Sequence, residues 1–270
     1  MKKHHLINPV KRHVVAAYLL MSCFLISGAE SQIINCVKLP NATWSDAQSW
    51  TEGNVPSHEG ENAIVNGGLS VTVDSPVAAA IDVKIGNGTT PAPDGTLLIA
   101  SDFQVNNLSV GVAAQSSGRV EQSAGRVYVQ ELNLAGLAPA PVEATYDILG
   151  GSLTAEILTL GTMGPATLSL QGTGELVVVP SKLLAGPQSV LRFAEGNEGF
   201  PSLNAQAQVT IEPGATLMLV ASGSGTKAGK FTIIEASEPL AGSFRVELSG
   251  FEPGKARVLE DERGVVLEVK

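Results

Sequence analysis

Five glycines in the middle of the chain recur at a constant interval of 25 residues: Gly86, Gly111, Gly136, Gly161 and Gly186. Each glycine follows a short run of mainly apolar residues. A fixed period in this size range is the signature of a repeat protein, in which each repeat is one small structural unit stacked on the next. The interval constrains the possible folds more strongly than any other feature of the sequence.

Apolar and polar residues alternate within the repeats, as in strands with one buried face. Val110, Leu134 and Leu160 are predicted to face inward, and the polar residue before each of them to face outward. One such coil cannot bury its apolar face alone, whereas coils stacked at about 4.8 Å pair each strand with its equivalents above and below. We therefore predict an all-β protein, a right-handed parallel β-helix (solenoid) with coils of about 25 residues and a cap at each end.

An antiparallel sandwich is the alternative fold, because it too has short strands at regular intervals. The constant phase of the glycines over five units argues against it. A left-handed β-helix would show a shorter, hexapeptide period, and the sequence has none. Aromatic residues make up only 4% of the chain, so the core is expected to consist of Val, Leu, Ile and Ala.

The N-terminal segment has the layout of a secretory signal peptide. Basic residues precede an apolar run at 14–26, and the small residues 27–29 provide a cleavage site after Ala29. We therefore assign residues 1–29 as a signal peptide and expect a secreted, cell-surface or periplasmic protein. Two alternatives stay open: an uncleaved anchor helix, and lipidation at Cys23, because residues 20–23 resemble a lipobox.

The remaining chain divides into three predicted segments: an N-terminal cap at 30–60, solenoid repeats at 61–220 and a C-terminal β cap at 221–270. The first segment contains both tryptophans, Trp44 and Trp50. We expect them to cover the open end of the first coil, because terminal repeats need capping. A sugar-stacking platform is the functional alternative. Cys36 would be the sole cysteine after cleavage, so no internal disulfide is expected.

Charge and histidine content exclude several classes of function. Cleavage after Ala29 would leave 13 basic and 26 acidic residues, a net charge of −13. Such a surface argues against nucleic acid and anionic membranes as partners. His58 would be the one remaining histidine, which excludes a multi-histidine metal site. We expect no metal, no cofactor and no membrane span in the mature chain, and extracellular polysaccharide or cell-surface components as partners.

No catalytic cluster stands out in the coil region, and no binding residues can be assigned. The acidic candidates are dispersed: Asp102, Glu121, Glu131, Asp147 and Glu156. The basic candidates are equally scattered: Lys84, Arg119, Arg126, Lys182 and Arg192. Arg119 and Arg126 flank one turn with Glu121, so the three could pair on one face. Solvated outward positions are the simpler interpretation of all these residues.

Several passages resemble known proteins. The pattern W-x5-W-x2-G-x-V-P at 44–56, followed by ENAIVNGGLSVTVD at 61–74, resembles the opening of bacterial secreted β-helix proteins. The passages AGKFTIIE at 228–235 and GSFRVEL at 242–248 resemble the closing part of autotransporter-passenger-like proteins. VEQSAGRV and LSLQGTGEL are similar to the degenerate coils of the same proteins. The resemblance implies an exported solenoid; without a C-terminal membrane barrel or sorting helix, it does not imply autotransport.

Two functions follow as expectations. The first is a non-enzymatic, exported β-solenoid that serves as a surface, adhesion or extracellular-matrix component. The alternative is a carbohydrate-active β-helix protein, either lyase-like or glycan-binding, that would use outward carboxylates together with Tyr128 or the tryptophan pair.

Overall fold

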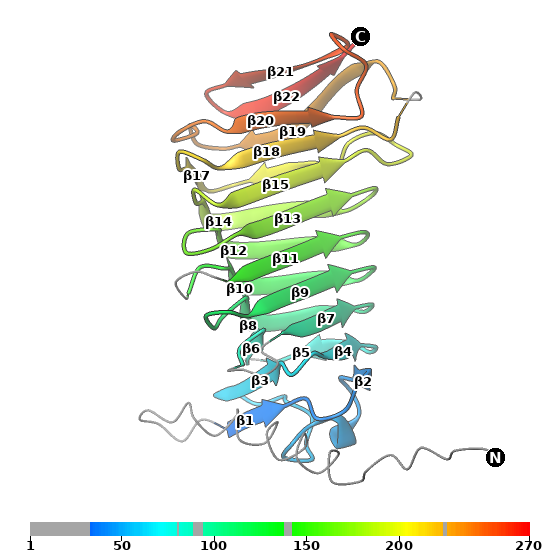
Figure 1. Cartoon of the computed structure of the whole chain (residues 1–270), viewed down its shortest axis with the longest axis vertical. Coiled ribbons are helices and arrows are strands. Elements are labelled where there is room, and N and C mark those ends of the chain that lie inside the picture. Colours follow the sequence, from blue (N-terminus) through cyan, green and yellow to red (C-terminus); the bar gives the residue numbers. More distant parts are fainter. Residues whose placement is uncertain (1–32, 80, 89–93, 138–141, 224–225) are drawn as a thin grey trace, which may run out of the picture.

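The computed structural model describes residues 33–79, 81–88, 94–137, 142–223 and 226–270. Within these residues, the strands form two sheets that rise side by side along one long axis (Figure 1). The predicted signal segment, its cleavage site at Ala29 and the lipidation candidate Cys23 all lie outside the described residues.

A thirteen-stranded sheet and a nine-stranded sheet contain all the named strands. The thirteen-stranded sheet consists of β1 (Ile33–Cys36), β3 (Glu61–Val65), β5 (Val77–Ala78), β6 (Asp82–Ile85), β8 (Phe103–Val110), β10 (Arg126–Leu134), β12 (Ser152–Leu160), β14 (Glu175–Ala185), β16 (Leu203–Ala205), β17 (Gln208–Ile211), β19 (Gly229–Ala236), β22 (Gly264–Val269) and β21 (Ala256–Asp261). The nine-stranded sheet consists of β2 (Ala42–Thr43), β4 (Leu69–Val73), β7 (Gly95–Ile99), β9 (Ser117–Gln122), β11 (Glu143–Ile148), β13 (Ala166–Gln171), β15 (Ser189–Ala194), β18 (Thr216–Val220) and β20 (Arg245–Ser249). A short 3-10 helix, η1, spans Ala47–Ser49.

Each strand of a coil pairs in parallel with the equivalent strand of the next coil, which confirms the predicted all-β parallel solenoid. The stack has about eight turns of about 26 residues each. The coil length varies, because Ala144 pairs with Ala166, 22 residues later, whereas Thr216 pairs with Arg245, 29 residues later. Insertions in the turns therefore change the coil length without breaking the ladders. The right-handed sense stays a prediction.

The long strands of the thirteen-stranded sheet each carry two pairing stretches. In β8, Phe103 and Gln104 pair with β5, while the stretch 107–110 pairs with β6. In β14, the stretches 176–178 and 182–185 pair with β16 and β17 in the same way. A typical coil thus contributes two stretches to this sheet and one to the nine-stranded sheet.

The core is a continuous apolar column between the sheets. Val110, Leu134 and Leu160 occupy equivalent positions on β8, β10 and β12, and each is at most 1% exposed. The residues before them, Ser109, Asn133 and Thr159, are also in register, as the alternation predicts. Burying large aliphatic side chains typically contributes roughly 1.5–3 kcal/mol each, so this column is the main source of stability.

The glycine ladder marks one corner of the coils, with one correction. Gly86, Gly111 and Gly161 have φ of +68°, +65° and +60°, a left-handed conformation that favours glycine. In the fourth coil the equivalent position is held by Ala135, with φ +50°, because Val110 pairs with Leu134 and Leu134 with Leu160. Gly136 therefore lies one residue beyond the corner, and its assignment to the ladder was wrong. A coil one residue shorter shifts the structural position while the period in sequence stays constant.

At the N-terminal end, strands β1 and β2 add one further parallel strand to each sheet. Trp44 and Trp50 are both buried, with their ring centroids 4.9 Å apart in an edge-to-face arrangement, and Trp44 also contacts Phe103. The indole N–H of Trp50 donates to the backbone carbonyl of Trp44. Contrary to expectation, Cys36 is disulfide-bonded, and its partner lies outside the described residues.

The C-terminal end changes the pairing pattern. β19 pairs in parallel with β16 but antiparallel with β22, which in turn pairs antiparallel with β21. The inward side chains of β22 are buried and extend the core beyond the last coil. The nine-stranded sheet has no such extension among the described strands and ends at β20.

Candidate functional site

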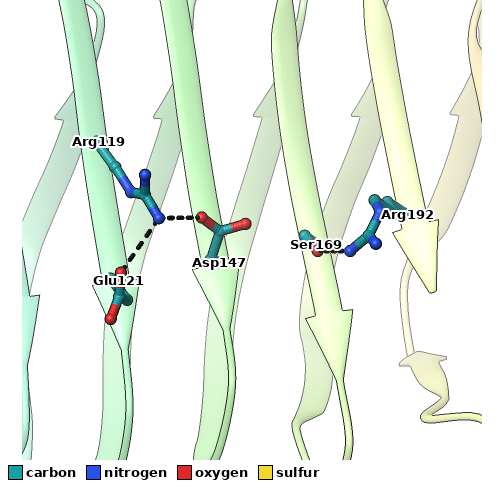
Figure 2. A network of polar contacts seen from close by, with 5 residues as sticks. All are labelled: Arg119, Glu121, Asp147, Ser169 and Arg192. Carbon is teal, nitrogen blue, oxygen red and sulfur yellow. Dashed lines mark hydrogen bonds and ion pairs between the residues drawn. The ribbon is translucent and has the colours of Figure 1, made fainter. Parts of the chain in front are cut away.

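The most extended polar network lies on the outer face of the nine-stranded sheet (Figure 2). Glu121, Asp147, Ser169 and Arg192 occupy equivalent positions on β9, β11, β13 and β15. They face outward because the residues on either side of each face the core. Arg119 lies two residues before Glu121 and therefore on the same face. Parallel in-register stacking thus brings together side chains that are 23 to 26 residues apart in sequence.

Arg119 links two coils by contacting both carboxylates. One guanidinium nitrogen, Nη2, lies 3.1 Å from Glu121 Oε2 and 3.2 Å from Asp147 Oδ2. Further along the column, Arg192 Nη1 donates to Ser169 Oγ at 3.0 Å. The network therefore consists of paired charges that bridge adjacent strands.

Asp147 is the least exposed charged group in this network, with its side chain 22% exposed. Burial raises its pKa above the ordinary value and Glu121 adds to the effect, while Arg119 and Arg192 oppose it. The net direction is upward, because losing hydration disfavours the charged carboxylate more than the two arginines stabilise it. The two acidic groups share one cation, which is the arrangement of a structural bridge.

The other candidate charges are dispersed over separate positions. Asp102 contacts Arg126, with a side-chain distance of 2.9 Å, and the guanidinium holds the pKa of Asp102 below its ordinary value. Arg126 lies on β10, in the other sheet from Arg119, so the proposed pairing of both arginines with Glu121 on one face is wrong. Lys84 and Lys182 belong to β6 and β14 and lie in neither contact.

Two further acidic candidates have neutral partners. Tyr128 donates its phenolic proton to Glu156, which raises the pKa of Tyr128. Asn133 Nδ2 donates to Glu131 Oε1 at 3.1 Å. Each of these carboxylates is therefore held by a side chain of its own coil or of a neighbouring one.

The tryptophans and the histidine do not form a site. Both indole rings are at most 1% exposed, so neither can stack on a sugar as the alternative interpretation required. His58 lies in a turn where the backbone N–H groups of Ser57 and His58 donate to Glu61 Oε2 at 2.7 and 3.0 Å. The imidazole contacts only the hydroxyl of Ser57 in this group, through Nδ1. Across the described parts of the chain, no three His, Cys, Asp or Glu side chains gather closely enough to hold a metal ion.

Sequence reasoning missed a shallow polar groove at one corner of the stack. It has a volume of about 480 Å³, and its lining residues come from successive coils: Asp94, Gln115, Ser116, Ser117, Val142, Glu143, Pro165 and Gln188. They precede the strands of the nine-stranded sheet, and register places Ser117 beside Glu143. No motif marks these positions, because the turns vary in length between coils.

The groove contains both engaged and open polar groups. Asp94 Oδ1 accepts hydrogen bonds from the backbone N–H and the hydroxyl of Ser117, both at 2.8 Å. Gln115, Glu143 and Gln188 are exposed, and Gln115 has a positive φ of 63°. An exposed carboxylate and two exposed amides can together accept and donate hydrogen bonds to a hydroxyl-rich ligand.

No protein-family model, curated protein or solved structure matches this chain. The fold defines its class, which is that of the parallel β-solenoids. Among the described residues, no helix has the length and apolar character needed to cross a membrane.

Proposed function

We propose that this chain is an exported, non-enzymatic β-solenoid that serves as a component of a cell surface or extracellular matrix. The observation that carries the proposal is that outward charges are paired with each other across the coils. Arg119 bridges Glu121 and Asp147, and Arg126 pairs with Asp102. Individual exposed pairs contribute little to stability, but these contacts give each charged group a fixed structural partner.

The shape supports the same proposal. About eight turns at a spacing of about 4.8 Å give a solenoid axis of roughly 40 Å. Repeat proteins of this kind use extended surfaces to contact large partners. An acidic, regular surface of this length is suited to assembly with other surface components.

Export is supported by the N-terminal sequence. Basic residues, an apolar run and small residues before position 30 form the pattern of a signal peptide. The resemblance to bacterial secreted, autotransporter-passenger-like solenoids points in the same direction. We propose cleavage after Ala29, with lipidation at Cys23 as the second route.

Fractionation of a bacterial host that expresses the full chain with a C-terminal tag tests export. N-terminal sequencing of the exported product should begin at Glu30; a blocked, acylated N-terminus at Cys23 would indicate the lipidated form. Retention of the intact chain in the cytoplasm would contradict export. Purified exported protein should then bind isolated cell-surface material, without releasing reducing ends from it.

The corner groove favours glycan binding as a second candidate function. Its exposed groups, Gln115, Glu143 and Gln188, come from successive coils, as an extended chain of sugars lying along the solenoid would require. A carboxylate in the groove and a strongly acidic surface favour neutral over polyuronic glycans.

A glycan array, together with reducing-end assays on polyuronides with and without calcium, separates the two candidates. If the groove binds glycans, Gln188→Ala and Glu143→Gln should each weaken binding. Gln104→Ala, at an exposed position on β8, serves as the matched control. Release of reducing ends would instead identify a carbohydrate-active enzyme and contradict the first proposal.

A further inference from the structure

The nine-stranded sheet ends in an open strand edge. β20 pairs with β18 along one side, and none of the described strands pairs with its other side. Figure 1 shows β20 as the final strand of its sheet, whereas β22 and β21 continue the other sheet. An unpaired edge presents a row of backbone N–H and C=O groups, which makes it a template for one more strand.

The inward side chains of β20 are incompletely covered. Val246 and Leu248 stand in register with Leu217 and Leu219 of β18. The two β18 leucines are fully buried, but Val246 is 37% exposed and Leu248 is 42% exposed. The apolar column therefore continues to the end of the sheet and remains partly open to solvent there.

The outward side chains of β20 carry both signs of charge. Arg245 and Glu247 lie two residues apart on the same face, and Arg245 Nη2 contacts Glu247 Oε1 at 2.9 Å. Phe244, just before the strand, faces inward and is 8% exposed. The strand thus has an apolar inner face and an outer face with one positive and one negative group.

We propose that β20 pairs antiparallel with β20 of a second copy, so that two solenoids join end to end in a symmetric dimer. The pairing would make the two nine-stranded sheets continuous across a two-fold axis. It uses the same physics as strand addition to an exposed sheet edge, with backbone hydrogen bonds for affinity and side-chain contacts for register.

Charge complementarity selects both the occupant and the register. Inward residues must lie opposite inward residues, since a shift by one residue would turn the apolar face outward. With Val246 on the two-fold axis, Arg245 lies opposite the second copy's Glu247, and the symmetry produces this pair twice. Phe244 then lies opposite the second copy's Leu248.

The neighbouring register is less favourable. Centring the pair on Glu247 would place two glutamates opposite each other, and like charges in directly opposed positions are destabilising. A strand with alternating charges of opposite sign is complementary to its own antiparallel copy, whereas a strand bearing one sign of charge would match only half of it. The sequence of β20 therefore favours self-pairing about Val246.

Sedimentation velocity of the full-length protein, processed by its host, tests the dimer with charge variants. Arg245→Glu and Glu247→Arg should each raise the dimer dissociation constant roughly tenfold or more, because each creates two like-charge pairs. The double variant Arg245→Glu/Glu247→Arg restores both pairs and should return the constant to within about threefold of wild type. Arg263→Glu, outside β20, is the control and should leave it unchanged.

Cross-linking tests the register independently of affinity. Val246→Cys should form an intermolecular disulfide on mild oxidation, since residues directly opposite have Cβ atoms about 4.5–5.5 Å apart. Glu247→Cys should cross-link far less. A wild-type protein that stays monomeric at millimolar concentration overturns the proposal, as does a double variant no stronger than the single ones. Preferential cross-linking through Glu247→Cys also overturns it.

Discussion

Tyr146 donates its phenolic proton to Gln122 Oε1 at 3.0 Å inside the solenoid core, where both side chains are fully buried. Gln122 Nε2 donates in turn to the backbone carbonyls of Gly125 and Ser152, each at 3.1 Å. Burial raises the pKa of Tyr146 well above its ordinary value, so the phenol remains a donor. These bonds join a side chain of β9 to β11, to a turn and to the start of β12.

Removing the tyrosine hydroxyl tests the value of this link. Tyr146→Phe leaves Gln122 Oε1 buried without its donor, which typically costs about 1–3 kcal/mol. Urea unfolding followed by circular dichroism measures the loss. Tyr128→Phe is the matched control, because its partner Glu156 is outward, and it should change stability by less than about 0.5 kcal/mol. Equal effects of the two variants would show that the buried bond has no special weight.

A charge in the apolar column should unfold the protein far more readily. Leu160→Asp places a carboxylate between Leu134 and Ala185 and is expected to cost roughly 4 kcal/mol or more. Thr159→Asp introduces the same charge one residue earlier, on the outward side, and should cost far less. Thermal unfolding of both variants is the measurement. An unchanged melting temperature for Leu160→Asp would refute its inward position.

The corner position gives a prediction of opposite signs in two coils. Gly86→Ala would place a Cβ 2.4 Å from the carbonyl oxygen of Ser117 at φ +68°, and should cost about 2 kcal/mol or more. Ala135→Gly relieves the same conformation, but the more flexible unfolded chain offsets the gain, so stability should change by at most about 1 kcal/mol. Denaturant midpoints decide. An Ala135→Gly loss as large as that of Gly86→Ala would contradict the corner assignment.

Asp147 should make stability depend on pH. Its pKa is raised in the folded state, so its contribution is greatest below the unfolded value near 3.8 and is lost as pH rises through the folded pKa. Asp147→Asn removes this dependence. The melting temperature of the variant relative to wild type should therefore rise between about pH 3 and pH 6. A difference that falls over this range would mean that Arg119 controls the ionisation of Asp147.

The repeat predicted the class of fold because a parallel stack imposes the same inward and outward pattern on every coil. Alternation alone placed Val110, Leu134 and Leu160 in the core, as the structure confirms. It could not detect Ala135, because coil lengths vary in the turns and a constant glycine period hides a shift of one residue. Tyr146 and Gln122 were also invisible as a pair, since only register makes residues 24 apart direct neighbours.

The sequence by itself determined the repeat, the all-β architecture and the acidic surface, because these depend on local alternation, period and composition. Only the tertiary structure decided which charges meet. Stacking brought Arg119 to Asp147 across two coils, sent Arg126 to Asp102 on the other sheet and gathered Glu143 and Gln188 along one corner. The physical reason is that contacts in a solenoid run perpendicular to the chain, so small differences in turn length select the partners.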